Sequence, residues 1–201
     1  MKFIVKGNEP AAWKAYRKTP GVDFYAIQEL KVALLSEQGY LCCYCMHPIN
    51  IGKMQVEHYK PRSIYPDLKF DYTNLFAVCE GNFCTDRHCD NKKGNTELSI
   101  HPADSRNNCE GIVCYSTNGK LTYPERYKID IEQTLNLNNS VLISNRKGAL
   151  SGAVRALSKI NYKRSKIQKL IDQYKTKDGD GKFYPYSNLI LWLLNKKLSG
   201  N

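Results

Sequence analysis

The sequence predicts an α+β protein in which a short, cysteine-rich centre is flanked by mostly α-helical regions. Helix-period apolar patterning occupies both ends, whereas residues 41–100 lack it and are rich in Cys, Asn, Pro and aromatic residues. Two apolar stretches in this centre, KMQVEH (53–58) and NLFAVC (74–79), are typical of short strands. Because apolar burial alone cannot hold so irregular a segment, it indicates a bound metal. We expect a helical segment at 1–40, a metal-bound core at 41–100 and a basic helical region at 101–201, packed as one unit with the core.

The flanking regions carry the helical signals. In VDFYAIQELKVALLSEQGY (22–40), apolar residues recur at helical spacing and Gly39 is a natural stop, so this stretch predicts one helix. Asn139 or Ser140 is the expected N-cap of a later helix. ALSKINYKRSKIQKLIDQY (156–174) has a basic stripe beside an apolar stripe, which predicts an amphipathic helix. A last apolar helix is expected at 187–197.

The net charge of +11 is concentrated near the carboxy terminus. Residues 121–201 carry 15 Lys and Arg against 6 Asp and Glu, which attracts a polyanion such as nucleic acid but equally fits a solvated basic face.

The opening MKFIVKGNEP lacks a signal-peptide apolar run, and the longest apolar stretch, LILWLL (189–194), is too short to span a membrane. We therefore expect a cytoplasmic protein that does not act at a membrane.

The eight cysteines indicate a structural zinc site, because an intracellular chain keeps its thiols reduced. LCCYCMHPI has Cys42 and Cys45 at knuckle spacing, and AVCEGNFCTDRHCDNKKG (77–94) offers the second half. The predicted ligands are Cys42, Cys45, Cys79 and Cys89, although the gap before the last one leaves Cys84 as an alternative. Three further thiols are expected to be buried and without a metal, and one histidine is expected at the rim of the site: Cys43, Cys109 and Cys114, and His88.

Four segments, in this order, resemble the PtuB-type HNH endonucleases of Septu and retron antiphage systems: YCMHPI (44–49), VEHYKPRSIYP (56–66), FDYTNLFAVC (70–79) and HCDNKKG (88–94). The resemblance covers roughly residues 36–100. It implies a ββα-metal fold, in which a hairpin and the following helix hold one divalent cation and a zinc knuckle ties them together.

The resemblance also implies roles for individual residues. His58 would be the general base, and Asn74 would orient it across the intervening loop. Glu57 and Asp90 would bind Mg²⁺ or Mn²⁺, with Asn91 as the alternative to Asp90, because the commonest last ligand in the family is Asn. Lys93 would contact the phosphate. Further contacts with nucleic acid are expected from Lys60, Arg62, Lys92, Lys159, Lys163 and Lys166.

The predicted function is metal-dependent hydrolysis of phosphodiester bonds by a nuclease effector of antiphage defence. The resemblance implies a PtuA-like ABC-type ATPase as partner, with or without a retron reverse transcriptase and its RNA and DNA. The HNH mechanism uses water and ignores the 2′-hydroxyl, so DNA, tRNA and other RNA all remain open. The alternatives are a zinc-knuckle protein that binds nucleic acid without cutting it and a protein-binding scaffold. The adjacent Glu57 and His58 favour the enzyme, because a pure binder does not need them.

Overall fold

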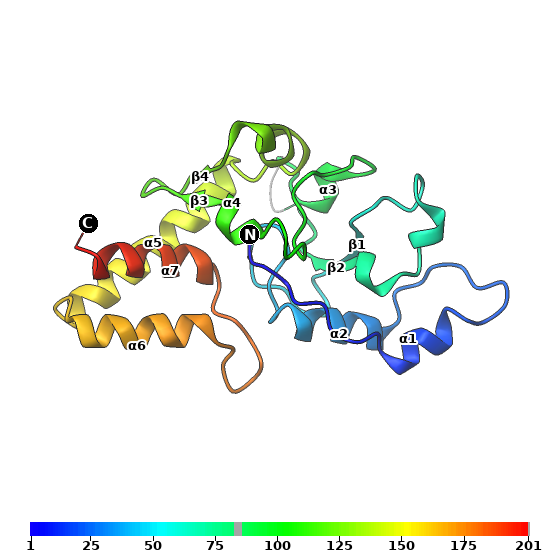
Figure 1. Cartoon of the computed structure of the whole chain (residues 1–201), viewed down its shortest axis with the longest axis horizontal. Coiled ribbons are helices and arrows are strands. Elements are labelled where there is room, and N and C mark those ends of the chain that lie inside the picture. Colours follow the sequence, from blue (N-terminus) through cyan, green and yellow to red (C-terminus); the bar gives the residue numbers. More distant parts are fainter. Residues whose placement is uncertain (83–85, 201) are drawn as a thin grey trace.

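The described part of the chain, residues 1–82 and 86–200 of a computed structural model, consists of helices and two small antiparallel sheets (Figure 1). The α-helices are α1 (Ala11–Tyr16), α2 (Gln28–Glu37), α3 (Asp90–Lys93), α4 (Cys109–Ile112), α5 (Ser140–Lys159), α6 (Arg164–Lys175) and α7 (Ser187–Leu198), and short 3₁₀ and π segments lie between them. The strands are β1 (Gln55–His58), β2 (Leu75–Val78), β3 (Cys114–Tyr115) and β4 (Leu121–Thr122). This mixture confirms the predicted α+β class.

The β1–β2 hairpin is the centre of the half of the molecule that contains the cysteines. Its register pairs Glu57 with Phe76 and His58 with Leu75. All of β2 is buried, whereas β1 alternates, with Glu57 buried and His58 half-buried, because neighbouring strand residues face opposite sides. Beyond the hairpin, the backbone N–H of Ala77 donates to Gln38 Oε1 (2.7 Å) and its carbonyl accepts from Gln38 Nε2 (2.7 Å). The Gln38 side chain, at the end of α2, thus makes with β2 the two hydrogen bonds that a neighbouring strand would make.

The predicted helix at 22–40 is shorter in the structure. It begins at Gln28, and its buried residues are Leu30, Leu34 and Leu35. Phe24 lies outside it and packs into an aromatic cluster with Trp13 and Phe70. The apolar spacing therefore predicted too early a start for the helix, because Phe24 packs against Phe70 in the loop between β1 and β2.

The carboxy-terminal helices form the other end of the molecule, where α5, α6 and α7 lie side by side (Figure 1). Asn139 is the N-cap of α5 and accepts from Leu142 N–H (2.9 Å), as predicted. The single helix expected at 156–174 is wrong: Asn161 and Tyr162 have φ of 50°, in the left-handed region, and end α5 before α6 begins. The last helix was predicted correctly.

Long side chains join the two ends of the molecule. Lys177, in the loop before α7, donates to the carbonyls of Ser36 (2.6 Å) and Glu37 (3.2 Å) at the end of α2. Arg146 of α5 is buried and donates to the carbonyls of Gly119 (2.6 Å) and Leu137 (2.7 Å). The division into regions at residues 40 and 100 stays a prediction. Among the described helices, none is both long and apolar enough to cross a lipid bilayer.

Candidate active site

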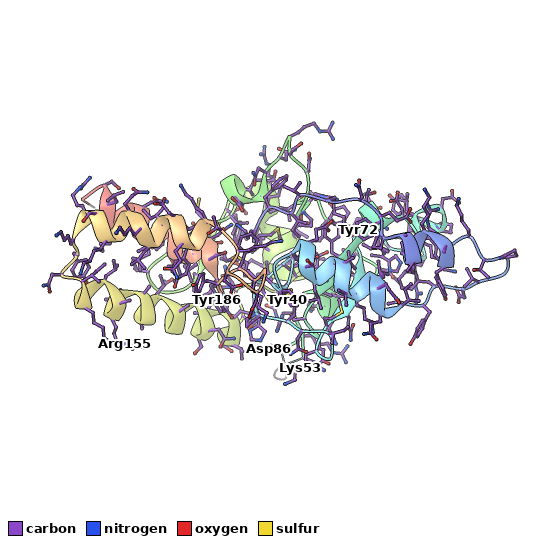
Figure 2. All side chains as sticks on the ribbon, turned by 90° about the horizontal axis from the view of Figure 1, so that it is seen from below. Tyr40, Lys53, Tyr72, Asp86, Arg155 and Tyr186 are labelled. Carbon is purple, nitrogen blue, oxygen red and sulfur yellow. The ribbon has the colours of Figure 1, made fainter. Side chains whose placement is uncertain are left out.

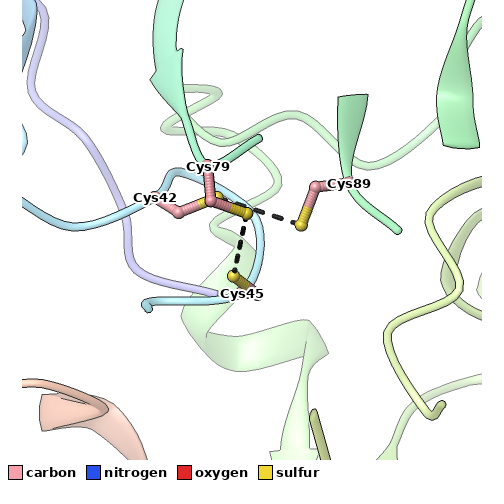
Figure 3. Close-up of side chains that lie close together, drawn as sticks. All are labelled: Cys42, Cys45, Cys79 and Cys89. Atoms are coloured by element: carbon pink, nitrogen blue, oxygen red, sulfur yellow. Dashed lines mark hydrogen bonds between the residues drawn. The ribbon is translucent and has the colours of Figure 1, made fainter. Parts of the chain in front are cut away.

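Four buried cysteines meet behind the hairpin (Figure 3). The sulfurs of Cys42, Cys45, Cys79 and Cys89 all lie within 4.8 Å of one another, with 3.9 Å between Cys42 and Cys89 and 3.8 Å between Cys45 and Cys79. A tetrahedral zinc ion with Zn–S bonds of about 2.3 Å requires sulfur separations of about 3.8 Å. Burial raises the pKa of the Cys89 thiol, so a thiolate there requires a cation beside it. The set of donors therefore fits zinc.

The predicted cysteines are the ones that cluster. Cys89 takes the fourth position, directly before α3, and its N–H donates to the carbonyl of Leu135 (2.9 Å). Cys84, the alternative, lies outside the described residues. The turn after Cys79 requires Gly81, whose φ is +65° and at which a Cβ would lie 2.1 Å from the carbonyl oxygen of His88.

Two minor expectations about this region are wrong. His88 is fully buried beside the cluster, with Nδ1 at 3.2 Å from Cys89 Sγ, and does not lie at a solvent-exposed rim. Its proximity follows from the turn at Gly81, which folds residue 88 back toward Cys79. Cys43 and Cys109 are buried as expected, but Cys114 is exposed because it lies on the two-residue strand β3 at the surface.

A cleft of about 480 Å³ opens beside β1 and the start of α3. It brings together three of the residues predicted to carry the chemistry, Glu57, His58 and Asp90, whereas Asn74 and Lys93 do not line it. Its remaining lining includes Arg62 from the loop after β1 and residues 24–26 and Lys31 from the amino-terminal segment. The residues come from three separate parts of the chain, which the β1–β2 hairpin and α3 place next to one another.

His58 is oriented by the loop between the two strands. Its Nε2 lies 2.9 Å from the backbone carbonyl oxygen of Lys69, and its ring meets the Phe24 ring edge-on with centroids 4.4 Å apart. Because a carbonyl oxygen only accepts, Nε2 carries the proton of the neutral ring and Nδ1 keeps a lone pair. Burial lowers the pKa of the imidazole, which favours this neutral form at pH 7. The ring is thus arranged to accept a proton at Nδ1.

Asn74 acts on the loop that contains Lys69. Its Oδ1 accepts from the N–H of Lys60 (2.7 Å), and its Nδ2 donates to the carbonyls of Lys60 (3.0 Å) and Leu68 (3.2 Å). These bonds fix the two ends of the loop next to His58 and Lys69. Asn74 is therefore placed to position His58 through the loop backbone.

Glu57 is buried and held by two donors that the sequence did not indicate for this role. Tyr44 donates its hydroxyl to Glu57 Oε1 (2.8 Å), and Lys93 Nζ lies 2.7 Å from the same oxygen. Neither bond occupies Oε2. Lys93 also donates to the carbonyl of His58 (3.1 Å). The Lys93 side chain has no exposed surface, so the phosphate contact expected of it is not available in this arrangement.

Asp90 lines the same cleft as Glu57. Burial, and then the hydrogen bond and negative charge of Asp90, raise the pKa of the Glu57 carboxyl well above its usual range. Two adjacent carboxylates favour a shared proton or a bound cation. Asn91 is exposed and faces away from the cleft, with its Cβ 3.0 Å from the position of a Cβ on Gly81. The geometry therefore favours Asp90 over Asn91 as the second carboxylate ligand.

The cationic side chains predicted to bind nucleic acid are dispersed. Arg62 lines the cleft, whereas the Lys60 ammonium forms an ion pair with Glu97, and Lys92 is exposed on α3. The other three, Lys159, Lys163 and Lys166, are exposed around the α5–α6 turn, at the opposite end of the molecule from the hairpin (Figure 1). Figure 2 shows Arg155 of α5 at that same end, far from Tyr72 of the hairpin loop. They do not share one helical face, because the chain reverses at residues 161–162.

Removing the Lys93 ammonium is expected to destabilise the fold. Lys93→Met leaves the buried Glu57 carboxylate without its counter-charge, and breaking a buried ion pair in this way typically costs about 3–5 kcal/mol in the free energy of unfolding. The measurement is urea denaturation of the purified protein. The control is Lys92→Met on the same helix, an exposed position where a change within about 0.5 kcal/mol is expected. Equal stability of the two variants would contradict the assigned role of Lys93.

Two curated proteins are similar in sequence to this chain. One, "Retron Vc95 putative HNH endonuclease" of Vibrio cholerae serotype O1 biovar El Tor, is 31% identical over 110 residues, which are 53% of this chain and 52% of the relative. The other, "Septu protein PtuB" of Bacillus thuringiensis, is 31% identical over 75 residues, 36% of this chain and 26% of the relative. The chain thus spans about half the length of the first relative and a quarter of the second. No family model matches the chain. The resemblance to PtuB-type HNH proteins that the motifs predict is confirmed by these two homologues.

Proposed function

We propose that this chain is a metal-dependent HNH endonuclease that hydrolyses phosphodiester bonds in DNA or RNA. The observation that carries the proposal is the cleft, which is lined by His58, with its Nε2 on the carbonyl of Lys69, and by two acidic residues, Glu57 and Asp90. A general base next to a cation site is the minimum that water-driven cleavage of a phosphodiester needs. The name of one homologue, "Retron Vc95 putative HNH endonuclease", supports the same activity.

The proposed cation ligands are Glu57 and Asp90. Two carboxylates in contact favour a hard divalent cation such as Mg²⁺ or Mn²⁺, because carboxylate oxygens are the ligands such ions prefer. When bound, the ion supplies charge neutralisation at the scissile phosphate and at the leaving 3′ oxygen. Tyr44 and Lys93 hold Glu57 through Oε1, which fixes the direction of Oε2.

His58 is the proposed general base. A water molecule attacks phosphorus and transfers a proton to Nδ1, while the N–H at Nε2 stays on the carbonyl of Lys69 and steadies the imidazolium that forms. The bond between phosphorus and the 3′ oxygen breaks, and the 3′ oxygen takes a proton from solvent. Arg62 at the edge of the cleft is suited to bind a flanking phosphate.

We also propose that the chain acts as the nuclease effector of an antiphage system with an ABC-type ATPase partner, with or without a retron reverse transcriptase. The retron and Septu names of the two homologues support a place in such a system. The ATPase and the reverse transcriptase are what the resemblance of the motifs implies. The exposed basic side chains Lys159, Lys163 and Lys166 offer a second surface, for nucleic acid or for the partner. Plasmid DNA and total RNA, incubated with the protein alone and together with the ATPase, distinguish the substrates.

Substitutions at α3 test the carboxylate ligand. Asp90→Ala is expected to abolish cleavage in Mg²⁺ through loss of the cation, with partial rescue by excess Mn²⁺, whereas Asn91→Ala is expected to cut normally. Asp90→Asn keeps one oxygen ligand and removes one charge, so activity is expected to return at higher Mg²⁺. The measurement is the initial cleavage rate against Mg²⁺ concentration, with zinc content checked because Cys89 is adjacent. If Asn91→Ala is inactive and Asp90→Ala is active, the second cation ligand is Asn91 and not Asp90.

A further inference from the structure

The cleft has a wall that the HNH motifs do not supply. Residues 24–26 and Lys31, from the segment between α1 and α2, line it opposite α3. Within this wall, exposure alternates: Asp23 and Tyr25 are exposed, whereas Phe24 and Ala26 are half-buried. The Tyr25 side chain is 68% exposed, which is high for so large an aromatic residue. A large exposed aromatic side chain at the mouth of a candidate active site requires an explanation.

The backbone beside Tyr25 is firmly held. The Phe24 ring packs against Trp13 (5.6 Å between centroids) and against His58 (4.4 Å). Asp23 accepts from the N–H of Phe24 (2.7 Å), and its backbone carbonyl accepts from the hydroxyl of Tyr16 (2.9 Å). Phe24 is half-buried in these contacts, whereas Tyr25 lines the cleft with its side chain exposed.

The same segment is attached to the loop that orients the proposed base. The Lys69 ammonium forms an ion pair with Asp23, while the Lys69 carbonyl holds His58 Nε2. The guanidinium of Arg62 lies over the other ring of this wall, 5.8 Å from the centroid of Phe24. Tyr25 is therefore mounted at a fixed place relative to His58, with cationic Arg62 and Lys31 lining the same cleft.

We propose that Tyr25 is a stacking platform for an unpaired base next to the scissile phosphate, so that the enzyme acts on single-stranded nucleic acid or on unpaired loops. This inference rests on the proposed nuclease function and specifies its substrate. An exposed aromatic ring beside cationic side chains is how proteins hold single strands without reading sequence, because every base has a face that stacks. In a duplex the bases are stacked on one another and paired, so their faces cannot reach Tyr25.

Binding separates the contribution of Tyr25 from catalysis. In an inactive His58→Ala background, adding Tyr25→Ala is expected to weaken binding of a fluorescent single-stranded oligonucleotide about 5- to 150-fold, the range for loss of one base–aromatic stack. Binding of the matching duplex is expected to stay the same. Tyr25→Phe, which keeps the ring, should bind like tyrosine. The control is Ile129→Ala, because Ile129 is an apolar residue of similar exposure, at 62%, that does not line the cleft.

Cleavage by the otherwise wild-type protein completes the test. The wild type is expected to cut the single strand faster than the duplex, and Tyr25→Ala to lose that preference. The inference is overturned, with the nuclease function intact, if Tyr25→Ala binds and cuts the single strand like the wild type or if the wild type prefers the duplex. It is also overturned if Tyr25→Ala changes only the activity measured with the ATPase, which would make the residue a protein contact. A wild type that cuts neither substrate, alone or with the ATPase, refutes the nuclease function itself.

Discussion

Replacing Cys42 or Cys45 by serine is expected to release one zinc ion per chain and to unfold the cysteine-rich half of the molecule. The four sulfurs have the separations of a tetrahedral zinc site, and structural zinc sites contribute on the order of 10 kcal/mol to folding. That is comparable with the whole free energy of unfolding of a native domain, which is about 5–15 kcal/mol. The measurements are zinc content by elemental analysis and thermal unfolding by circular dichroism.

The other cysteines provide the controls for the zinc prediction. Cys114→Ser changes an exposed thiol outside the cluster and is expected to keep both the zinc and the stability of the wild type. Cys89→Ser should lose zinc, whereas Cys84→Ser should keep it. A wild-type protein purified without zinc would refute the structural role of the cluster. If Cys84→Ser loses zinc and Cys89→Ser keeps it, the fourth ligand is Cys84 and not Cys89.

Substituting His58 by alanine is expected to reduce cleavage by about 10²–10⁴-fold, the usual cost of losing a general base. The ring is half-buried and makes its contacts at the edge of the cleft, so zinc content and the unfolding temperature should stay close to wild type. The measurement is the initial rate of cleavage of plasmid and RNA in Mg²⁺, with both properties measured on the same preparation.

A second histidine offers a matched control for His58. His101 is also half-buried and also meets an aromatic ring edge-on, with 4.0 Å between its centroid and that of Tyr59, but it does not line the cleft. His101→Ala is therefore expected to remove similar packing and keep the activity. If His58→Ala cuts at the wild-type rate, or if both variants lose activity equally, the assignment of His58 as the base is wrong.

The sequence predicts the parts of this molecule that short-range chemistry dictates. Knuckle spacing identifies Cys42 and Cys45, and ordered motifs place Glu57, His58 and Asp90 around one cleft. The cysteine cluster can be predicted from the sequence because tetrahedral coordination of zinc needs four ligands, and few residues in this segment can provide them.

Residues whose roles depend on distant contacts could not be predicted. Phe24 fits the apolar spacing of a helix, yet its partners are His58 and Phe70 in another part of the chain. The family resemblance implied a phosphate contact for Lys93, whereas here its ammonium pairs with the buried carboxylate of Glu57. The break at Asn161 and Tyr162 was missed because the side-chain pattern continues across it while the backbone reverses.

The chemistry of the cut ends tests the central claim, that water activated by His58 attacks phosphorus in this cleft. The products of plasmid and RNA cleavage in Mg²⁺ or Mn²⁺ are analysed for their termini by mass spectrometry. Attack by water with departure of the 3′ oxygen predicts 5′-phosphate and 3′-hydroxyl ends on DNA and RNA alike. A 2′,3′-cyclic phosphate on RNA would mean that the 2′-hydroxyl is the nucleophile, and that result would contradict the mechanism derived from Glu57, His58 and Asp90.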